Sequence, residues 1–372
     1  MRWIRRAGMI CVLILAAGCS RQASPLAEGA SPPPALSART ASEAAPAGPT
    51  LEPSPSPTPD WLSQPGEVID PENVMRLREA AVVPLGGEAY QLRWSQDGQV
   101  LAAFSSAYLL ALRPVGLETL TTVVLQAPIQ LLDYSPDAGW MATTSDPLKV
   151  DLRDPATGAV VRTLNSVGVV GAAFSPDGQS LVVANSDNFT AEVFNPADGS
   201  LRETLSGFET AAPIYGVQFD APSDRLIWFA RGTVQVMQLP GGQLGAQLNH
   251  EDSVSALALS PSGSLLAAAA AGTQDGFFTP LLQLWDPTSG EPLGRLALDE
   301  PAYGGMDFSA DGRLLALSVG EVVMIYDVAA QQPLAALNGH ADGVRALRFS
   351  PDGMLLATLG MDQTLRLWKA AP

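Results

Sequence analysis

Short apolar runs and turn-forming residues alternate at a regular interval from about Glu67 to the end of the chain. Seven times, a large residue is followed by a turn similar to Ser-Pro-Asp-Gly, at spacings of 40, 40, 45, 40, 49 and 41 residues. A short apolar run follows each turn, and such runs between turn residues predict β-strands. The large residues that mark the repeats are Trp94, Tyr134, Phe174, Phe219, Leu259, Phe308 and Phe349.

A second turn within each unit predicts further strands. Asn195-Pro196-Ala197-Asp198-Gly199 follows one predicted strand, and Arg153–Gly158 and Trp285–Gly290 repeat the same turn chemistry. Short runs after these turns, such as 160–164 and 292–296, predict a fourth strand in each unit. Because the runs after the first turn are apolar on both faces, each sheet is expected to be sandwiched between its neighbours. Seven such units predict an all-β, seven-bladed β-propeller over residues 67–372.

The last unit, Gly339 to Trp368, resembles a WD40 repeat. It begins with Gly339-His340 and ends with Leu367-Trp368-Lys369, where that family usually has Trp-Asp and this chain has Lys369. The resemblance implies a structural tetrad in which hydrogen bonds join the side chains of His340, Thr358, Asp362 and Trp368. A His beside Asp and Thr can also suggest a nucleophile with its base, but the spacing is that of the repeat and favours the structural role. The unit from His250 to Trp285 is lengthened and displaces Asp275, so a tetrad is not expected there.

This last unit lacks a fourth strand of its own, because the chain ends four residues after Trp368. An open sheet edge leaves unpaired backbone groups and favours aggregation. We therefore expect the segment around 75–85, before the first repeat, to complete the last blade and close the ring.

The N-terminal residues predict export and lipidation. Residues 1–19 combine Arg2, Arg5 and Arg6 with an apolar run from Ala7 to Ala17, which is about half the length that spans a bilayer and so predicts a signal peptide. Leu15-Ala16-Ala17-Gly18-Cys19 resembles a bacterial lipobox, with Ala16 where Leu or Val is usual, and the resemblance implies that Cys19 becomes the lipid-bearing first residue. The alternative is an ordinary cleaved signal with an incidental cysteine. Residues 20–66 contain eleven prolines, which predicts a disordered tether.

Charge and composition limit the partners and the kinds of site that are expected. The formal net charge of −17 makes nucleic acid an unexpected partner, because affinity for phosphate backbones depends on clustered Lys and Arg. Cys11 and Cys19 are the only cysteines and His250 and His340 the only histidines, so no metal or cofactor site is expected. Familiar nucleophile and phosphate-loop motifs are also missing from the sequence.

Loops that depart from the repeat length are the candidate partner-binding surface. The segments 206–215, 272–280 and 299–303 are expected on one face of blades four, five and six, and they combine aromatic rings with carboxylates, as protein-binding and glycan-binding surfaces often do. The alternative is that these aromatics only cap the ends of the blades. The candidate residues are Phe208, Glu209, Tyr215, Asp275, Phe277, Phe278, Glu300 and Tyr303.

Together these features predict a monomeric, lipid-anchored propeller outside the cytoplasm, attached to the outer membrane if the cell has one. It would act without catalysis as a scaffold for a protein partner, or for a glycan. One alternative is an enzyme or small-ligand sensor with a site at the central channel, which predicts carboxylates converging at the channel mouth on the first strands of several blades. Another is an assembly factor for envelope proteins, which differs from a scaffold only in its partner.

Overall fold

A computed structural model describes the chain from Gly66 to Ala371, with short gaps. The positions not described within this range are 106–107, 125–128, 138, 207–213, 221–223, 231, 250–252, 275–276, 299, 301 and 303. The predicted signal peptide, lipidated Cys19 and almost the whole predicted tether lie outside the described residues.

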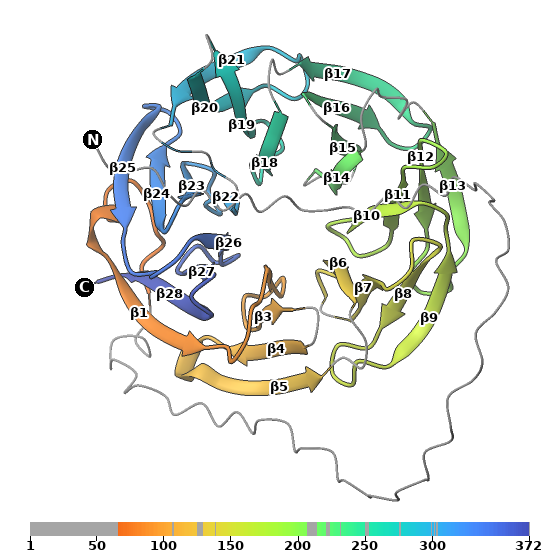
Figure 1. The fold of residues 1–372 in the computed structure, drawn as a ribbon, viewed down its shortest axis with the longest axis horizontal. Helices are drawn as coiled ribbons and strands as arrows, with labels where there is room; N and C mark the ends of the chain where they lie inside the picture. The colour runs from red at the N-terminus through yellow and green to blue at the C-terminus, as the bar shows by residue number, and fades with distance from the viewer. Residues whose placement is uncertain are drawn as a thin grey trace, which may run out of the picture. The chain divides into compact units, whose positions relative to one another are not determined.

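Seven four-stranded antiparallel sheets stand around a central channel, with their first strands innermost (Figure 1). Blade 1 consists of β2 (Gln91–Trp94), β3 (Leu101–Phe104), β4 (Tyr108–Arg113) and β5 (Glu118–Val124). Blade 2 consists of β6 (Gln130–Tyr134), β7 (Met141–Thr144), β8 (Lys149–Arg153) and β9 (Val160–Asn165). Blade 3 consists of β10 (Val169–Phe174), β11 (Leu181–Asn185), β12 (Thr190–Phe194) and β13 (Leu201–Leu205).

The remaining blades follow the same order. Blade 4 consists of β14 (Ile214–Phe219), β15 (Arg225–Ala230), β16 (Thr233–Gln238) and β17 (Gln243–Asn249). Blade 5 consists of β18 (Ser253–Leu259), β19 (Leu266–Gln274), β20 (Phe277–Trp285) and β21 (Pro292–Ala297). Blade 6 consists of β22 (Met306–Phe308), β23 (Leu314–Val319), β24 (Val322–Asp327) and β25 (Gln332–Leu337). Blade 7 consists of β26 (Val344–Phe349), β27 (Leu356–Gly360), β28 (Thr364–Ala370) and β1 (Leu77–Pro84).

The part of the chain that the structure describes contains no α-helix. It contains 3-10 helices at Val74–Arg76 (η2) and Val115–Leu117 (η3). No helix within the described ranges has the length and apolar character needed to cross a bilayer.

The recurring turn between the first two strands of a blade is held by side-chain hydrogen bonds. In blade 7, Ser350 Oγ donates to Asp352 Oδ1 at 2.5 Å and accepts the backbone N–H of Leu355 at 2.9 Å. Gly353 closes the turn at φ +72°, a conformation that favours glycine. Blade 4 has Asp220 in place of the serine, and its carboxylate accepts a 2.6 Å hydrogen bond from Arg225 Nε. The sequence repeat therefore marks a structurally equivalent turn even where its residues change.

Blade 7 is completed by the strand that precedes the first repeat, as the sequence predicts. β1 pairs antiparallel with β28, for example Leu77 with Ala370 and Val82 with Arg366. The backbone groups at the outer edge of β28 are thereby paired, and segments from both ends of the propeller share one sheet (Figure 1).

The core lies between neighbouring blades. Every residue of β11 is buried, which agrees with the predicted sandwiching of strands that are apolar on both faces. One cluster joins Val182 and Ala184 of blade 3 to Leu226 and Trp228 of blade 4. Each large side chain buried in this way contributes about 1.5–3 kcal/mol relative to exposure, so the blades stabilise one another.

The structure corrects one predicted loop. The segment 272–280 was expected to be a loop, but β19 and β20 run through it as a long hairpin, with Gly272 opposite Thr279 and Gln274 opposite Phe277. Thr273, Phe277 and Phe278 belong to residue types that favour strands, which accounts for the longer hairpin. The extra residues of this unit therefore lengthen two strands.

Candidate functional site

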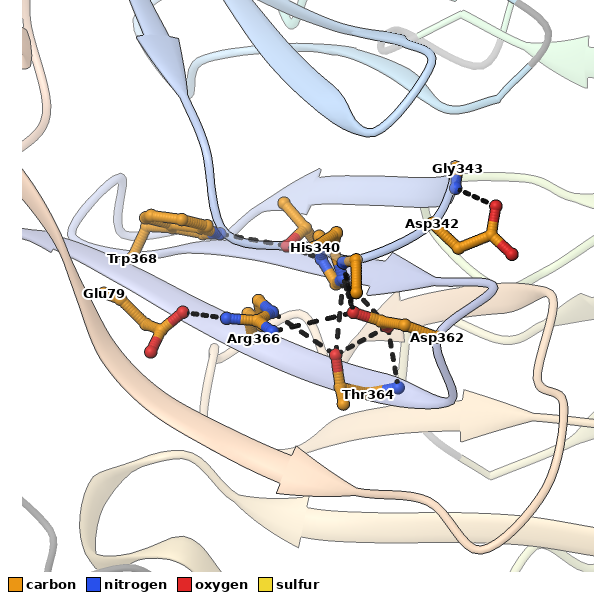
Figure 2. A network of polar contacts seen from close by, with 10 residues as sticks. Glu79, His340, Asp342, Gly343, Asp362, Thr364, Arg366 and Trp368 are labelled. Atoms are coloured by element: carbon orange, nitrogen blue, oxygen red, sulfur yellow. Dashed lines mark hydrogen bonds and ion pairs between the residues drawn. The ribbon is translucent and has the colours of Figure 1, made fainter.

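The four predicted tetrad residues form one hydrogen-bonded chain in blade 7 (Figure 2). Trp368 Nε1 donates to Thr358 Oγ1 at 2.9 Å, and Thr358 Oγ1 lies 2.8 Å from His340 Nε2. His340 Nδ1 lies 3.1 Å from Asp362 Oδ1. A neutral imidazole that donates from Nδ1 and accepts at Nε2 satisfies every link of this chain.

The electrostatics of the tetrad agree with a neutral histidine. Burial lowers the pKa of His340, although the neighbouring Asp362 carboxylate opposes this effect. For Asp362, burial alone would raise the pKa, but hydrogen bonds from the Ala341 N–H, from Thr364 and from His340 outweigh it and lower the pKa to about 2. Asp362 is therefore ionised and His340 uncharged at neutral pH.

The tetrad is connected to the strand that closes the ring. Arg366 Nη2 lies 3.6 Å from Asp362 Oδ2, and Arg366 Nη1 forms an ion pair with Glu79 of β1 (Figure 2). Thr358 is fully buried between the imidazole and the indole, so its hydroxyl has no path to a substrate. The arrangement holds strands together and does not resemble an accessible nucleophile.

The predicted partner-binding residues fall mostly where the structure gives no side-chain description. Phe208, Glu209, Asp275 and Tyr303 lie outside the described residues. Tyr215, Phe277 and Phe278 lie in β14 and β20, of which only the backbone is described at these positions. Glu300 is exposed. The candidate surface on blades 4 to 6 therefore stays a prediction.

A second surface on the same face was missed in the sequence and lies on blades 2 and 3. Three consecutive loops are joined there by backbone hydrogen bonds: Ser166 N–H donates to Leu148 O at 3.1 Å, and Ser186 N–H donates to Gly168 O at 2.8 Å. Each loop carries an exposed apolar side chain. We call these the apolar loop patch; its members are Leu148, Val167 and Phe189, with 55%, 52% and 37% of their surface exposed.

Phe189 has an unusual backbone conformation for its residue type. Its φ of +54° lies in the left-handed region, where a bulky side chain is uncommon and costs free energy. Gln363 takes the same conformation in the equivalent turn of blade 7. The sequence contains a sign of this conformation, because Asn188-Phe189-Thr190 aligns with Asp362-Gln363-Thr364. Using it requires knowing that the middle residue of this turn has a left-handed backbone.

The sequence comparisons agree with this geometry. The family model "WD domain, G-beta repeat" matches residues 242–277 and 331–369. The seven sheets, the recurring turns and these two matches decide the architecture. The chain is a seven-bladed, WD40-like β-propeller.

Individual relatives share only part of their length with this chain. Pre-mRNA-processing factor 19 homolog 2 of Arabidopsis thaliana is 30% identical over 187 residues, which cover 48% of this chain and 34% of the relative. An uncharacterized WD repeat-containing protein of Synechocystis is 30% identical over 119 residues, 32% of each chain. The guanine nucleotide-binding protein subunit beta of Saccharomyces cerevisiae is 33% identical over 72 residues, 19% of this chain and 17% of the relative. The chain thus spans about a third or less of these curated relatives.

The central channel of the propeller carries charged residues at one repeated position. In four of the seven blades, the residue just before the large residue of the repeat is charged: Arg93 in blade 1, Asp133 in blade 2, Asp307 in blade 6 and Arg348 in blade 7. Arg93 Nε donates to Asp133 Oδ1 at 3.0 Å, which joins blades 1 and 2. Burial raises the pKa of Asp307, and the positive charge of Arg348 opposes this shift. Burial lowers the pKa of Arg348, and the negative charge of Asp307 opposes that shift.

Both channel carboxylates also bind the backbone of the next blade. Asp133 Oδ2 accepts the Phe174 N–H, and Asp307 Oδ2 accepts the Phe349 N–H, each at 2.8 Å. The channel-enzyme alternative expects carboxylates on the first strands of several blades. Asp133 lies on β6 and Asp307 on β22, and the hydrogen bonds of both carboxylates join neighbouring blades. No group of three or more His, Cys, Asp or Glu in the described ranges is arranged to hold a metal ion.

Proposed function

We propose that this WD40 propeller is a non-catalytic scaffold that binds a protein partner through its loop face and is held at a membrane, outside the cytoplasm, by a lipid on Cys19. The observation that carries the binding role is the apolar loop patch. Exposed apolar side chains grouped on a rigid surface are typical of protein-binding sites. WD40 propellers similar to this chain are typically scaffolds for protein interactions.

The patch has the rigidity that a binding surface needs. Its loops are tied to one another by backbone hydrogen bonds, and Val169 N–H adds a third link by donating to Pro147 O at 2.9 Å. The strands that carry these loops are anchored in a closed ring. Because the loops are already ordered, little conformational entropy is lost when a partner binds, and less of the binding free energy is spent on ordering them.

Carboxylates beside the patch favour a partner that combines apolar and basic residues. Asp187 is exposed and lies two residues before Phe189, and Asp146 lies two residues before Leu148. The acidic chain as a whole would attract such a partner and repel an acidic one. A protein partner therefore fits the patch better than a glycan. An assembly factor for envelope proteins would use the same patch and differ only in the partner captured.

The test is affinity capture of partners from membranes with a patch variant. Leu148→Ser combined with Val167→Ser removes two exposed apolar side chains. Because both sites are exposed, the free energy of unfolding should change by no more than about 0.5 kcal/mol per site. Capture of the partner that the unmodified chain enriches should fall about tenfold or more.

A matched control is Leu244→Ser. Leu244 is 51% exposed on the outer strand β17, away from the loop face, and its substitution should leave capture unchanged. Equal capture by the patch variant and by the unmodified chain would refute the patch as the binding surface. Loss of capture with both variants would point to a non-specific apolar effect and would also refute it.

A further inference from the structure

A groove with a volume of about 660 Å³ lies at the junction of blades 3 and 4, and we call it the blade 3–4 groove. This volume is within the range of about 300–1,000 Å³ found for binding pockets. The groove is bordered by the first turn of each of these blades, which lies at the opposite strand ends from the loops of the apolar loop patch. The two surfaces are therefore separate. Among the residues that line the groove are Asp177, Val193, Arg202, Glu203, Asp224 and Leu239.

The apolar part of the lining is continuous with the core between the two blades. Val193 is 8% exposed and belongs to the buried cluster that joins blades 3 and 4. Phe219, which also lines the groove, and Leu239 are partly buried and pack against the same cluster. These side chains are fixed by the closed ring, so a bound segment would not have to order them.

The preceding junction, between blades 2 and 3, is crossed by an arginine. Arg162 is the third residue of β9, and Glu203 is the third residue of β13. Arg162 Nη1 donates to Asp198 O at 2.7 Å and Arg162 Nη2 donates to Ala197 O at 2.8 Å, so the guanidinium reaches the second turn of blade 3. Glu203 Oε1 instead accepts the N–H of Gly241 in blade 4 at 2.8 Å. A carboxylate thus replaces, at the blade 3–4 groove, the arginine that crosses the preceding junction.

The charged side chains of the groove are mostly acidic. Asp177, Glu203 and Asp224 line it together with one cation, Arg202. Arg202 Nη1 donates to Ser180 Oγ at 2.8 Å, which holds this guanidinium against blade 3. Asp177 and Asp224 are exposed, so a ligand can approach both. An excess of negative charge beside an apolar wall complements a cationic side chain with an apolar stem.

The turn on the blade 4 side favours arginine over lysine. Pro240 lines the groove and, by strand register, is the counterpart of Ala197, whose carbonyl accepts from Arg162 at the preceding junction. A guanidinium has several donors in one plane and can bind a carboxylate and a carbonyl together, whereas an ammonium acts as a point charge.

We propose that the blade 3–4 groove binds an arginine side chain of an extended segment of a partner protein. The methylene groups of the arginine pack on Val193 and Leu239, and its guanidinium pairs with the carboxylate of Glu203. Asp224 adds to the negative potential. This inference goes beyond the scaffold function, because it assigns a second binding surface, on the other face of the propeller, and the side chain that it recognises.

Binding is tested on the full chain by fluorescence anisotropy in about 0.15 M salt. The probe is a short labelled peptide that alternates arginine with leucine, and the comparison peptide carries neutral citrulline in place of arginine. The arginine peptide should bind with a Kd below about 100 µM, and the citrulline peptide should bind about tenfold more weakly or worse. Glu203→Gln keeps an oxygen for the Gly241 N–H but removes the charge, and it should weaken the arginine peptide about tenfold or more.

Two control variants separate the groove from other causes of peptide binding. Glu291→Gln removes an exposed carboxylate from the second turn of blade 5 and should leave the affinity unchanged, although it alters the net charge by the same amount as Glu203→Gln. Leu148→Ser combined with Val167→Ser, in the apolar loop patch, should also bind the peptide as the unmodified chain does.

The proposal is overturned if the citrulline peptide binds as tightly, if Glu203→Gln has no effect, or if Glu291→Gln weakens binding equally. Loss of binding in the patch variant would place the peptide on the apolar loop patch and refute the groove. Displacement of the peptide by an equal concentration of free arginine would show a small-molecule site and would also refute the docking of a partner segment. If Glu203→Gln does not fold, exposed Asp224→Asn provides the same test and should weaken the arginine peptide about threefold; unchanged binding by that variant would overturn the proposal.

Discussion

Thr358 is the residue on which the tetrad of blade 7 depends, since its hydroxyl joins His340 to Trp368. Thr358→Val keeps the shape but leaves the imidazole Nε2 and the indole Nε1 buried without this partner. Each lost partner costs about 1–3 kcal/mol, so the free energy of unfolding should fall by about 2–4 kcal/mol in a denaturant titration. Thr204→Val, on the exposed outer strand β13, is the matched control and should change it by less than about 0.5 kcal/mol. Equal effects of the two substitutions would rule out the structural role.

The titration of His340 makes a second prediction. Because burial lowers its pKa below the ordinary 6.5, the unfolded chain binds a proton more readily than the folded one. The stability from the neutral imidazole is therefore complete above pH 6.5 and is lost as the pH falls below it. Thermal unfolding midpoints between about pH 7.5 and about pH 5.5 should fall more steeply for the unmodified chain than for His340→Asn. Parallel pH profiles would contradict the neutral assignment.

At the residue scale, the sequence located positions better than it located surfaces. The tetrad residues were expected from the resemblance of the last unit to a WD40 repeat, and hydrogen bonds join all four side chains in the structure. Leu148 and Val167 looked like ordinary loop residues, because nothing in their immediate sequence says that two loops from successive units lie side by side. Exposure of an apolar side chain is set by neighbours that are distant in the sequence.

At the scale of single elements, β1 makes the strongest prediction. A chain that begins at residue 86 lacks β1 and the Glu79 partner of Arg366, and it exposes the edge of β28. It should associate or aggregate at a lower temperature, as size-exclusion chromatography and light scattering would show. The control is a chain that begins at residue 66 and keeps every described strand. A monomeric protein of unchanged thermal stability after removal of β1 would show that closure is dispensable.

Strands were predictable where the turn chemistry is local. Ser-Pro-Asp-Gly turns fix their own hydrogen bonds, so the strands on either side could be placed from the sequence. The long hairpin of β19 and β20 was not predicted, because Thr273, Phe277 and Phe278 are compatible both with a strand and with an aromatic loop. Only the pairing of Gly272 with Thr279 distinguishes the two.

For the whole molecule, repeat number and ring closure were predictable, because seven in-phase units need a partner for the last sheet. The contacts between side chains that line the channel could not be predicted from the sequence. Arg93 and Arg348 are far apart in the sequence, and closure places their first strands on adjacent blades, where Trp94 Nε1 donates to Arg348 O at 3.2 Å.

Attachment to a membrane is the last property that belongs to the whole molecule, and it depends on one thiol. If Cys19 carries the lipid, Cys19→Ala should abolish incorporation of labelled fatty acid and move the protein from the membrane pellet to the soluble fraction. Two acyl chains give stable anchoring, whereas one chain gives only marginal binding, so the shift should be nearly complete. Cys11→Ala is the matched control, because it removes the other cysteine from within the signal segment and should leave labelling and fractionation unchanged. A Cys19→Ala protein that remains in the pellet would refute the lipid anchor and leave the propeller and its apolar loop patch unaffected.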